Sequence, residues 1–159
     1  KDNVYLFIAV GNNIVRERIY NLVKQKGIKL ASYILSKAST WPNMEIGDNC
    51  FIGEGSVIQP FVKIGLNCIL FGARIGHHCN IGAHVLLSGP TIGGNVQIGD
   101  FSFIGLNAVV LQNLKIGPKN IIGMGVSIKN STSEGEVYSS PNYTKRKVKF
   151  DDISRNYLN

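Results

Sequence analysis

The sequence has few charged residues, few cysteines and no long apolar run. Charged side chains make up 17% of its 159 residues, against about a quarter in ordinary domains. Hydrophobic residues reach 44%, which excludes a disordered chain. No apolar stretch approaches the roughly 18 residues that a membrane span needs, and Val4–Val10 is too short for a signal peptide. Three cysteines are too few for a disulfide framework and favour a reducing compartment such as the cytoplasm.

Glycine is the residue in excess, and ten of the 18 glycines directly follow isoleucine. An aliphatic residue recurs every six positions over residues 46–128, giving fifteen hexapeptides, of which two are one residue short, before Ile75 and before Ile92. A period of six fits neither an α-helix nor an alternating strand. It predicts a β-solenoid of about five triangular coils between residues 40 and 129, with the aliphatic side chain pointing inward. The nearby glycine and asparagine residues are expected to allow positive φ at the corners.

The N-terminal residues predict a small βαβ unit. The apolar run Val4–Val10 indicates a buried strand, and Asn12 or Asn13 is placed to cap a helix over residues 14–26, which a glycine ends. A second strand is expected over residues 29–35. The predicted buried face of the helix consists of Val15, Ile19, Leu22 and Val23.

These patterns divide the chain into a partial βαβ segment (residues 1–38), a repeat domain (39–130) and a C-terminal extension (131–159). The net charge of +7 comes mainly from the helix and the C-terminal tail, including residues 145–147. Aromatic residues are not interleaved with these basic residues, so no nucleic-acid partner is expected. A polyanionic small molecule would be sufficient reason for the charge.

The three histidines are His77, His78 and His84. His77 and His78 occupy the second and third positions after the inward Ile75, near a corner of the solenoid. They could be two solvated corner residues. Alternatively, an imidazole at this place could act as a general base that takes a proton from an amine or hydroxyl group. His84 is expected to be a corner residue.

The run Gly-His-His-Cys-Asn-Ile-Gly over residues 76–82 resembles the histidine-bearing hexapeptide of the sialic-acid O-acetyltransferase-like sugar O-/N-acyltransferases. The resemblance implies a left-handed parallel β-helix, whereas the usual crossover rule alone would favour right-handed coils. It implies that His77 is the catalytic base and that His78 stands where the family commonly has an acidic residue. Gly94 is implied to donate its N–H to the thioester oxyanion, the alternative being a plain corner glycine.

The same resemblance implies the ligands. Acetyl-CoA would be the co-substrate, and its pantetheine arm would lie against Gly105, Leu106, Gly123 and Met124. Residues 145–147 could meet the CoA phosphates or form a solvated tail. Residues 7–13 resemble the second half of the family's nucleotide-sugar-binding domain, which implies that Gly11 and Asn12 contact the substrate. Members of the family typically form homotrimers with the sites between subunits, and no metal is expected.

The sequence therefore predicts an acetyl-CoA-dependent acetyltransferase that modifies an amino or hydroxyl group of a nucleotide-linked sugar for surface glycan synthesis in a bacterial cytoplasm. The alternative is a non-catalytic or decayed trimeric β-helix scaffold, which the two short repeats and the incomplete N-terminal match favour. A serine or antibiotic acetyltransferase fits the N-terminal residues less well. Cys50, Cys68 and Cys79 each lie four residues after an inward aliphatic residue, which indicates packing rather than nucleophiles or zinc ligands.

Overall fold

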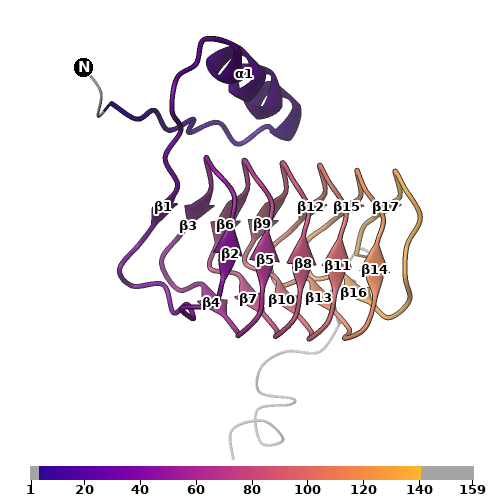
Figure 1. The fold of residues 1–159 in the computed structure, drawn as a ribbon. Coiled ribbons are helices and arrows are strands. Elements are labelled where there is room, and N and C mark those ends of the chain that lie inside the picture. The colour runs from indigo at the N-terminus through magenta and orange to yellow at the C-terminus, as the bar shows by residue number, and fades with distance from the viewer. Residues whose placement is uncertain (1–3, 141–159) are drawn as a thin grey trace, which may run out of the picture.

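The computed structural model describes residues 4–140 and is a left-handed parallel β-helix with a single α-helix packed on one of its corners (Figure 1). Three parallel sheets form the sides of a triangular prism, and the mainly-β fold predicted from the repeat is confirmed. Over the described part of the chain, no helix is long and apolar enough to cross a membrane.

The strands are short because each occupies one side of a coil. Sheet 1 has seven strands: β1 (Tyr33–Ile34), β3 (Phe51–Ile52), β6 (Ile69–Phe71), β9 (Leu86–Ser88), β12 (Phe103–Ile104), β15 (Ile121–Ile122) and β17 (Val137–Tyr138). Sheet 2 has five: β4 (Val57–Ile58), β7 (Arg74–Ile75), β10 (Thr91–Ile92), β13 (Val109–Val110) and β16 (Ser127–Ile128). Sheet 3 has five: β2 (Glu45–Ile46), β5 (Lys63–Ile64), β8 (Asn80–Ile81), β11 (Gln97–Ile98) and β14 (Lys115–Ile116).

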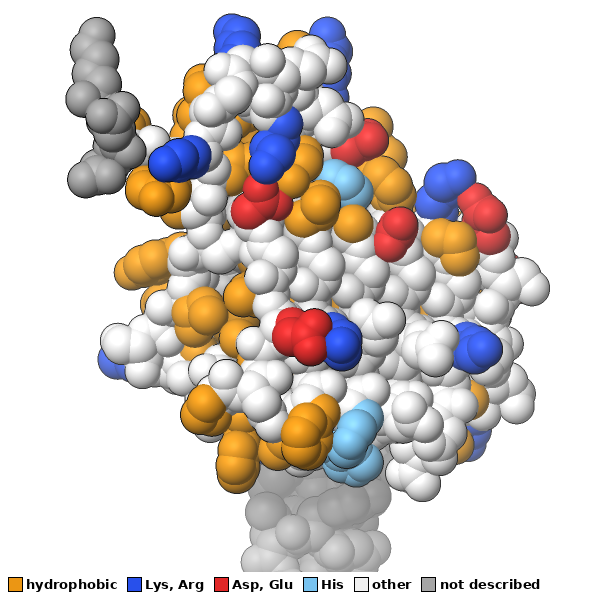
Figure 2. All heavy atoms as spheres, viewed as in Figure 1, with side chains coloured by type: hydrophobic (Ala, Val, Ile, Leu, Met, Phe, Trp, Pro, Cys, Tyr) orange, Lys and Arg blue, Asp and Glu red, His pale blue; other side chains and the backbone are white. Residues whose placement is uncertain are grey.

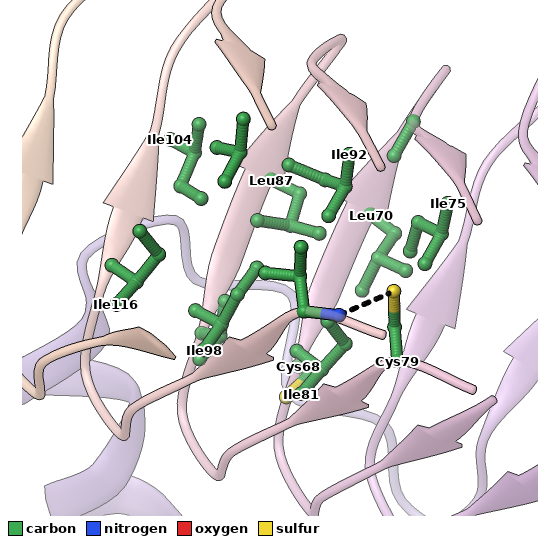
Figure 3. Close-up of a cluster of buried hydrophobic side chains, with 14 of the residues drawn as sticks. Cys68, Leu70, Ile75, Cys79, Ile81, Leu87, Ile92, Ile98, Ile104 and Ile116 are labelled. Atoms are coloured by element: carbon green, nitrogen blue, oxygen red, sulfur yellow. Dashed lines mark hydrogen bonds between the residues drawn. The ribbon is translucent and has the colours of Figure 1, made fainter. Parts of the chain in front are cut away.

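The predicted register is confirmed strand by strand. Strands β2 to β16 are the fifteen hexapeptides, and each pairs with the strand one coil away, as Ile98 does with Ile116. The inward aliphatic residues form one continuous buried core along the prism (Figure 3). The solenoid also extends beyond the predicted residues 40–129, because β1 and β17 add a strand to each end of sheet 1.

The corners correct the expected role of the repeated glycines. None of the ten glycines that follow isoleucine has positive φ. They are required for another reason: a Cβ on Gly65, for example, would lie 2.7 Å from the main-chain carbonyl carbon and oxygen of Gly82 in the next coil. Positive φ instead falls at the third position after the inward residue, or the second in the two short repeats, and asparagine often occupies it.

The three edges of the prism are each defined by their positive-φ residues. The His77 corner, between sheets 2 and 3, has Phe61, His78, Asn95 and Asn113. The helix corner, between sheets 3 and 1, has Asn49, Asn67, His84, Phe101 and Lys119. The glycine corner, between sheets 1 and 2, has Gly55, Gly72, Gly89, Asn107 and Gly125.

Helix α1 (Asn13–Gln25) lies over the helix corner (Figure 1). Asn12 is its N-cap and accepts a hydrogen bond from the Val15 amide at 3.0 Å. The predicted buried face is partly wrong, because Val15 and Leu22 are about half exposed. Val23 is buried as predicted, together with Arg16 and Tyr20, which were not predicted.

The expected βαβ unit is only rudimentary in the structure. The predicted strand over residues 4–10 is reduced to a single parallel bridge between Leu6 and Leu30. The second predicted strand does not complete a separate sheet, because Tyr33 and Ile34 pair with β3 of the solenoid. Ile8, Tyr20, Val23 and Leu30 form a small core of their own between the helix and the coils.

The outward faces of the three sheets differ in character. Sheet 3 presents only polar residues outward, and Figure 2 shows its charged side chains in the middle of the view, with histidine at both edges. Sheet 2 is mixed. Sheet 1 presents an apolar row that is in register from coil to coil: Tyr33, Phe51, Ile69, Leu86, Phe103, Ile121 and Val137.

Candidate functional site

His77 and Gly94 lie against each other on adjacent coils of the His77 corner. An ideal Cβ on Gly94 would be 2.8 Å from Nε2 of His77 and 2.9 Å from its Cε1. A side chain at this position would therefore displace the imidazole edge from the place that it occupies against Gly94. Among residues 4–140 the Gly94 amide donates no hydrogen bond to another main-chain or side-chain group, so this N–H stays available beside Nε2.

The His77 ring is oriented by its neighbours. Its Nδ1 lies 3.0 Å from Nδ1 of His78, and the two rings meet edge to face. His78 adopts a φ of 58° and packs against Phe61, with ring centroids 4.8 Å apart. The His77 amide donates to Oε1 of Gln59 at 3.1 Å. Both imidazoles are exposed, so a solvent-borne ligand can reach them.

His77 borders an open hollow of about 360 Å³ on the outer face of sheet 2. Gly94 and the side chains of Gln59 and Arg74 form part of the same wall. The hollow is lined in full by Val57, Gln59, Arg74, Ile75, Gly76, His77, Ile92, Gly93 and Gly94. The structure therefore brings together a candidate base, a free main-chain donor and a cationic side chain.

The residues predicted to hold the cofactor gather at the opposite edge of sheet 2. Leu106 and Met124 are exposed and line a hollow of about 290 Å³ at the glycine corner. Gly105 supports this wall, since a Cβ there would lie 2.9 Å from the Met124 amide nitrogen. Gly123 does the same one coil on, where a Cβ would lie 3.0 Å from the Tyr138 carbonyl oxygen.

The predicted substrate residues Gly11 and Asn12 line a third hollow, of about 530 Å³, at the helix corner. Oδ1 of Asn12 is already engaged in capping α1, where it accepts from the Val15 amide. The complete lining is Gly11, Asn12, Asn13, Ile14, Leu86, Phe101, Phe103, Lys119 and Ile121. Residues 145–147, expected near the CoA phosphates, lie outside the described residues.

The structure does not bring Gly11 and Asn12 to His77 within one chain. Their hollow is at the helix corner, and His77 is at a different edge of the prism, across the polar face of sheet 3. His84 is a corner residue, as expected, but it is buried. Burial lowers its pKa, and its ring stacks on Phe101 with centroids 4.7 Å apart.

Sequence reasoning missed the buried Arg16, which contacts three separate parts of the chain. An arginine on an amphipathic helix is ordinarily assigned to its solvent face, so the hydrophobic pattern of residues 14–26 did not indicate that Arg16 is buried. Gln59 and Arg74 were also missed, because only the coil stacking places them beside His77.

The three cysteines are buried, free thiols, which agrees with the packing role predicted for them. Burial raises the pKa of the Cys68 and Cys79 thiols and so keeps them protonated. The Sγ of Cys79 accepts a hydrogen bond from the Val96 amide of the next coil, marked in Figure 3. Over the described residues, no group of three histidine, cysteine or acidic side chains is arranged to hold a metal ion.

Comparison with known proteins identifies relatives of this chain. Residues 44–71 and 95–130 match the family described as the hexapeptide repeat of succinyl-transferase. GDP-perosamine N-acetyltransferase of Escherichia coli O157:H7 is 32% identical over 129 residues, covering 76% of this chain and 55% of the relative. The chain thus spans little more than half the length of this curated relative.

Two solved structures resemble the whole described fold. Perosamine N-acetyltransferase from Caulobacter crescentus, in complex with CoA and GDP-perosamine, has a TM-score of 0.82 and 27% identity over 84% of this chain and 65% of its own. The acetyltransferase domain of PglB from Neisseria gonorrhoeae, in complex with acetyl coenzyme A, has a TM-score of 0.82 and 29% identity over 84% of this chain and 66% of its own.

A variant of the Caulobacter crescentus protein with one histidine replaced by asparagine has also been solved with the same two ligands. Both the repeat match and these relatives agree with the resemblance drawn from residues 76–82. The chain therefore carries the hexapeptide repeat of this family on a left-handed β-helix, and the relatives that it resembles include an N-acetyltransferase of a GDP-linked sugar.

Proposed function

We propose that this chain transfers an acetyl group from acetyl-CoA to an amino or hydroxyl group of a nucleotide-linked sugar, as a step in surface glycan synthesis. The observation that carries the proposal is the contact of the His77 Nε2 edge with Gly94, whose N–H is free, in an open hollow. The relatives that bind CoA and GDP-perosamine support the choice of substrates.

In the proposed reaction His77 is the general base. With the shared hydrogen on Nδ1 of His77, donated to Nδ1 of His78, the lone pair of Nε2 is free to accept a proton. The sugar nitrogen or oxygen attacks the thioester carbon and gives its proton to Nε2. The C–S bond then breaks, and the proton passes from Nε2 to the departing sulfur of CoA. The Gly94 N–H stabilises the oxyanion between the two steps.

His78 takes the place of the acidic residue that commonly follows the histidine in the family. A neutral imidazole can accept the Nδ1 hydrogen of His77 and fix its tautomer, as a carboxylate would. It supplies less negative charge to stabilise the imidazolium formed during the reaction. Its packing against Phe61 holds it in place for this orienting role.

The outer face of sheet 2 offers acetyl-CoA a path to His77. Leu106 and Met124 lie at the glycine-corner edge of this sheet, and His77 and Gly94 lie at its other edge. An extended pantetheine arm crossing the face would pass Thr91 and Val109, which point outward from β10 and β13. The thioester would then arrive beside Gly94, with the adenine nucleotide beyond Met124.

The nucleotide sugar would use the hollow lined by Gly11 and Asn12 at the start of α1. The positive end of the helix dipole suits a diphosphate there, and Lys119, whose ammonium group pairs with Glu134 at 2.7 Å, lines the same hollow. This hollow and His77 lie at different corners of one prism, so the site we propose is completed by a neighbouring copy in a homotrimer. The apolar outward row of sheet 1 supports such an assembly, since a row of this kind is ordinarily covered.

The test is CoA release with acetyl-CoA and GDP-perosamine or another amino-sugar nucleotide, measured for wild type, His77→Asn and Gln97→Ala. Loss of a general base is expected to lower turnover about 10²- to 10⁴-fold, while acetyl-CoA binding by calorimetry stays unchanged. Gln97 is exposed on the polar face of sheet 3, so its variant is the matched control. Sedimentation equilibrium checks for the trimer.

Two results would contradict the proposal in different ways. Wild-type turnover in His77→Asn would remove His77 as the base. Absence of both acetyl-CoA binding and CoA release in the wild-type protein would instead favour the non-catalytic scaffold.

A further inference from the structure

Arg16 is the largest fully buried side chain of the described structure, with 0% of its surface exposed. None of the ion pairs among residues 4–140 involves it. Burying a guanidinium group without a carboxylate is costly unless hydrogen bonds replace its water. The burial lowers the pKa of Arg16, although not enough to deprotonate a group of this kind. The hydrogen bonds of Arg16 must therefore offset the cost of burying its guanidinium group.

The partners of Arg16 are oxygen atoms from three separate parts of the chain, which lie on two sides of its guanidinium group. On one side Nη1 donates to the carbonyl oxygens of Val10 and Gly11, both at 2.9 Å, and Nη2 donates to Oδ1 of Asn13 at 2.9 Å. On the other side Nε donates to the carbonyl of Asn67 at 3.0 Å, and Nη2 donates to that of His84 at 3.2 Å. The guanidinium group thus joins the turn before α1 to two coils of the solenoid.

A chain of side-chain amides provides a second anchor, for the residues just before this turn. The Ile8 amide donates to Oδ1 of Asn49 at 2.8 Å, and Nδ2 of Asn49 donates to Oδ1 of Asn67 at 2.6 Å. Nδ2 of Asn67 then faces Nδ1 of His84 at 2.8 Å. These three side chains lie on successive coils at the helix corner.

The direction of this amide chain follows from its first member. A main-chain N–H can only donate, so the Asn49 atom that it meets must be the oxygen, and each following amide is oriented in turn. The last donor, Nδ2 of Asn67, requires an unprotonated Nδ1 on His84. His84 is therefore neutral and carries its hydrogen on Nε2.

We propose that Arg16, with the amide chain through Asn49, is a positioning residue for the turn formed by residues 10–13, which lines the hollow for the nucleotide sugar. The inference rests on the proposed function for the identity of that ligand. Arg16 holds the carbonyl oxygens of Val10 and Gly11 toward itself. Carbonyls released from it could turn into the hollow, where they would repel the oxygens of a diphosphate.

The primary test is Arg16→Lys in the full chain, with Arg18→Lys as the matched control on the exposed face of the same helix. Lysine keeps the positive charge, but a single ammonium group cannot span both sets of acceptors. We expect KM for GDP-perosamine, or for whichever sugar nucleotide the wild type uses, to rise about tenfold or more, while kcat and KM for acetyl-CoA stay within about twofold. Arg18→Lys should behave as wild type.

A second measurement follows the turn without any substrate. Amide hydrogen exchange of residues 8–14 is expected to accelerate about tenfold or more in Arg16→Lys, while exchange of the β10–β15 amides stays as in wild type. If the wild-type protein has no activity on any sugar nucleotide, the proposed function fails and this exchange result alone decides the positioning role.

Should Arg16→Lys fail to fold, Asn49→Asp tests the same turn from its other anchor. Its carboxylate still accepts from the Ile8 amide but repels Oδ1 of Asn67, and the same split between the two KM values is expected. An unchanged sugar-nucleotide KM, an equal rise in both KM values, or unchanged exchange over residues 8–14 would overturn the proposal.

Discussion

Gly65→Ala tests the close approach of successive coils directly. Gly65 follows the inward Ile64 at the end of β5 and does not have positive φ, so alanine meets no backbone strain of its own. Its Cβ would lie 2.7 Å from both the carbonyl carbon and oxygen of Gly82, and 2.8 Å from the amide nitrogen of Ala83. All three atoms belong to the main chain of the next coil and cannot turn aside.

The loss of stability in Gly65→Ala follows from the main-chain shift that the added methyl group would force. Relieving the contacts requires a shift of several tenths of an ångström between the coils, which stretches the bond from the Gly65 amide to the Ile81 carbonyl, now 2.8 Å long. Overpacking a tight core costs about 1–3 kcal/mol, and a backbone contact lies at the upper end of that range. For a chain of this size, about 3 kcal/mol corresponds to a melting temperature lower by roughly 6–12 °C.

The assay is thermal unfolding followed by circular dichroism at one fixed protein concentration, because association would shift the midpoint. Gly11→Ala is the matched control: a Cβ there meets nothing within 4 Å and φ is not positive. Its free energy of unfolding should change by no more than about 0.5 kcal/mol. Equal melting of Gly65→Ala and wild type, or equal losses in both variants, would refute close approach as the reason for the repeated glycine.

Two further predictions concern the helix corner and the cofactor wall. Burial lowers the pKa of His84 in the folded state, so on acidification the unfolded state takes up the proton at a higher pH than the folded state does. The free energy of unfolding should therefore be constant above about pH 6.5 and decline as pH falls from there through the folded pKa. His84→Asn, which suits the positive φ and can still accept from Asn67, should flatten that decline in urea unfolding at pH 5 and 7. A decline of equal size in the variant would count against His84 as its source. Leu106→Asp should raise KM for acetyl-CoA several-fold through charge repulsion. The melting temperature should change little, because the Leu106 side chain is exposed. An unchanged KM would remove Leu106 from the pantetheine path.

The coils could be predicted from the sequence because the inward residue recurs with a fixed period. Every hexapeptide places one aliphatic side chain in the same environment, so the pattern identifies all fifteen strands from β2 to β16 and their partners. Strand β17 was not predicted, and the strand expected over residues 29–35 was assigned to a βαβ unit rather than to the solenoid, since neither Ile34 nor Tyr138 belongs to the aliphatic repeat over residues 46–128. Both strands pair because the ends of sheet 1 offer unpaired main-chain groups, which no side-chain pattern records.

The candidate site was only partly predictable, for a physical reason. The resemblance implied that His77 and Gly94 act in the same reaction, and the structure puts these two residues in contact. Arg16 could not be found from the sequence, because its partners are mainly main-chain carbonyls, which every residue has. A side chain that is satisfied by backbone leaves no complementary charge elsewhere in the sequence, so only the folded coils reveal it.

The two short repeats belong to the two coils that carry His77 and Gly94, and they are shortened at the opposite edge of sheet 2. Both remove one residue from the glycine corner, and Gly72 and Gly89 take positive φ one position earlier than the other corners do. The strands that follow them are β7 and β10, and His77 and Gly94 lie two residues beyond the ends of these strands. A solenoid of uniform hexapeptides would present a flat face here, with every coil alike. Two successive coils are shortened at one edge, which breaks that uniformity. In the described chain these are the only two coils on which a histidine lies against a glycine. The irregular repeats that favoured a decayed scaffold are therefore also consistent with a local binding hollow.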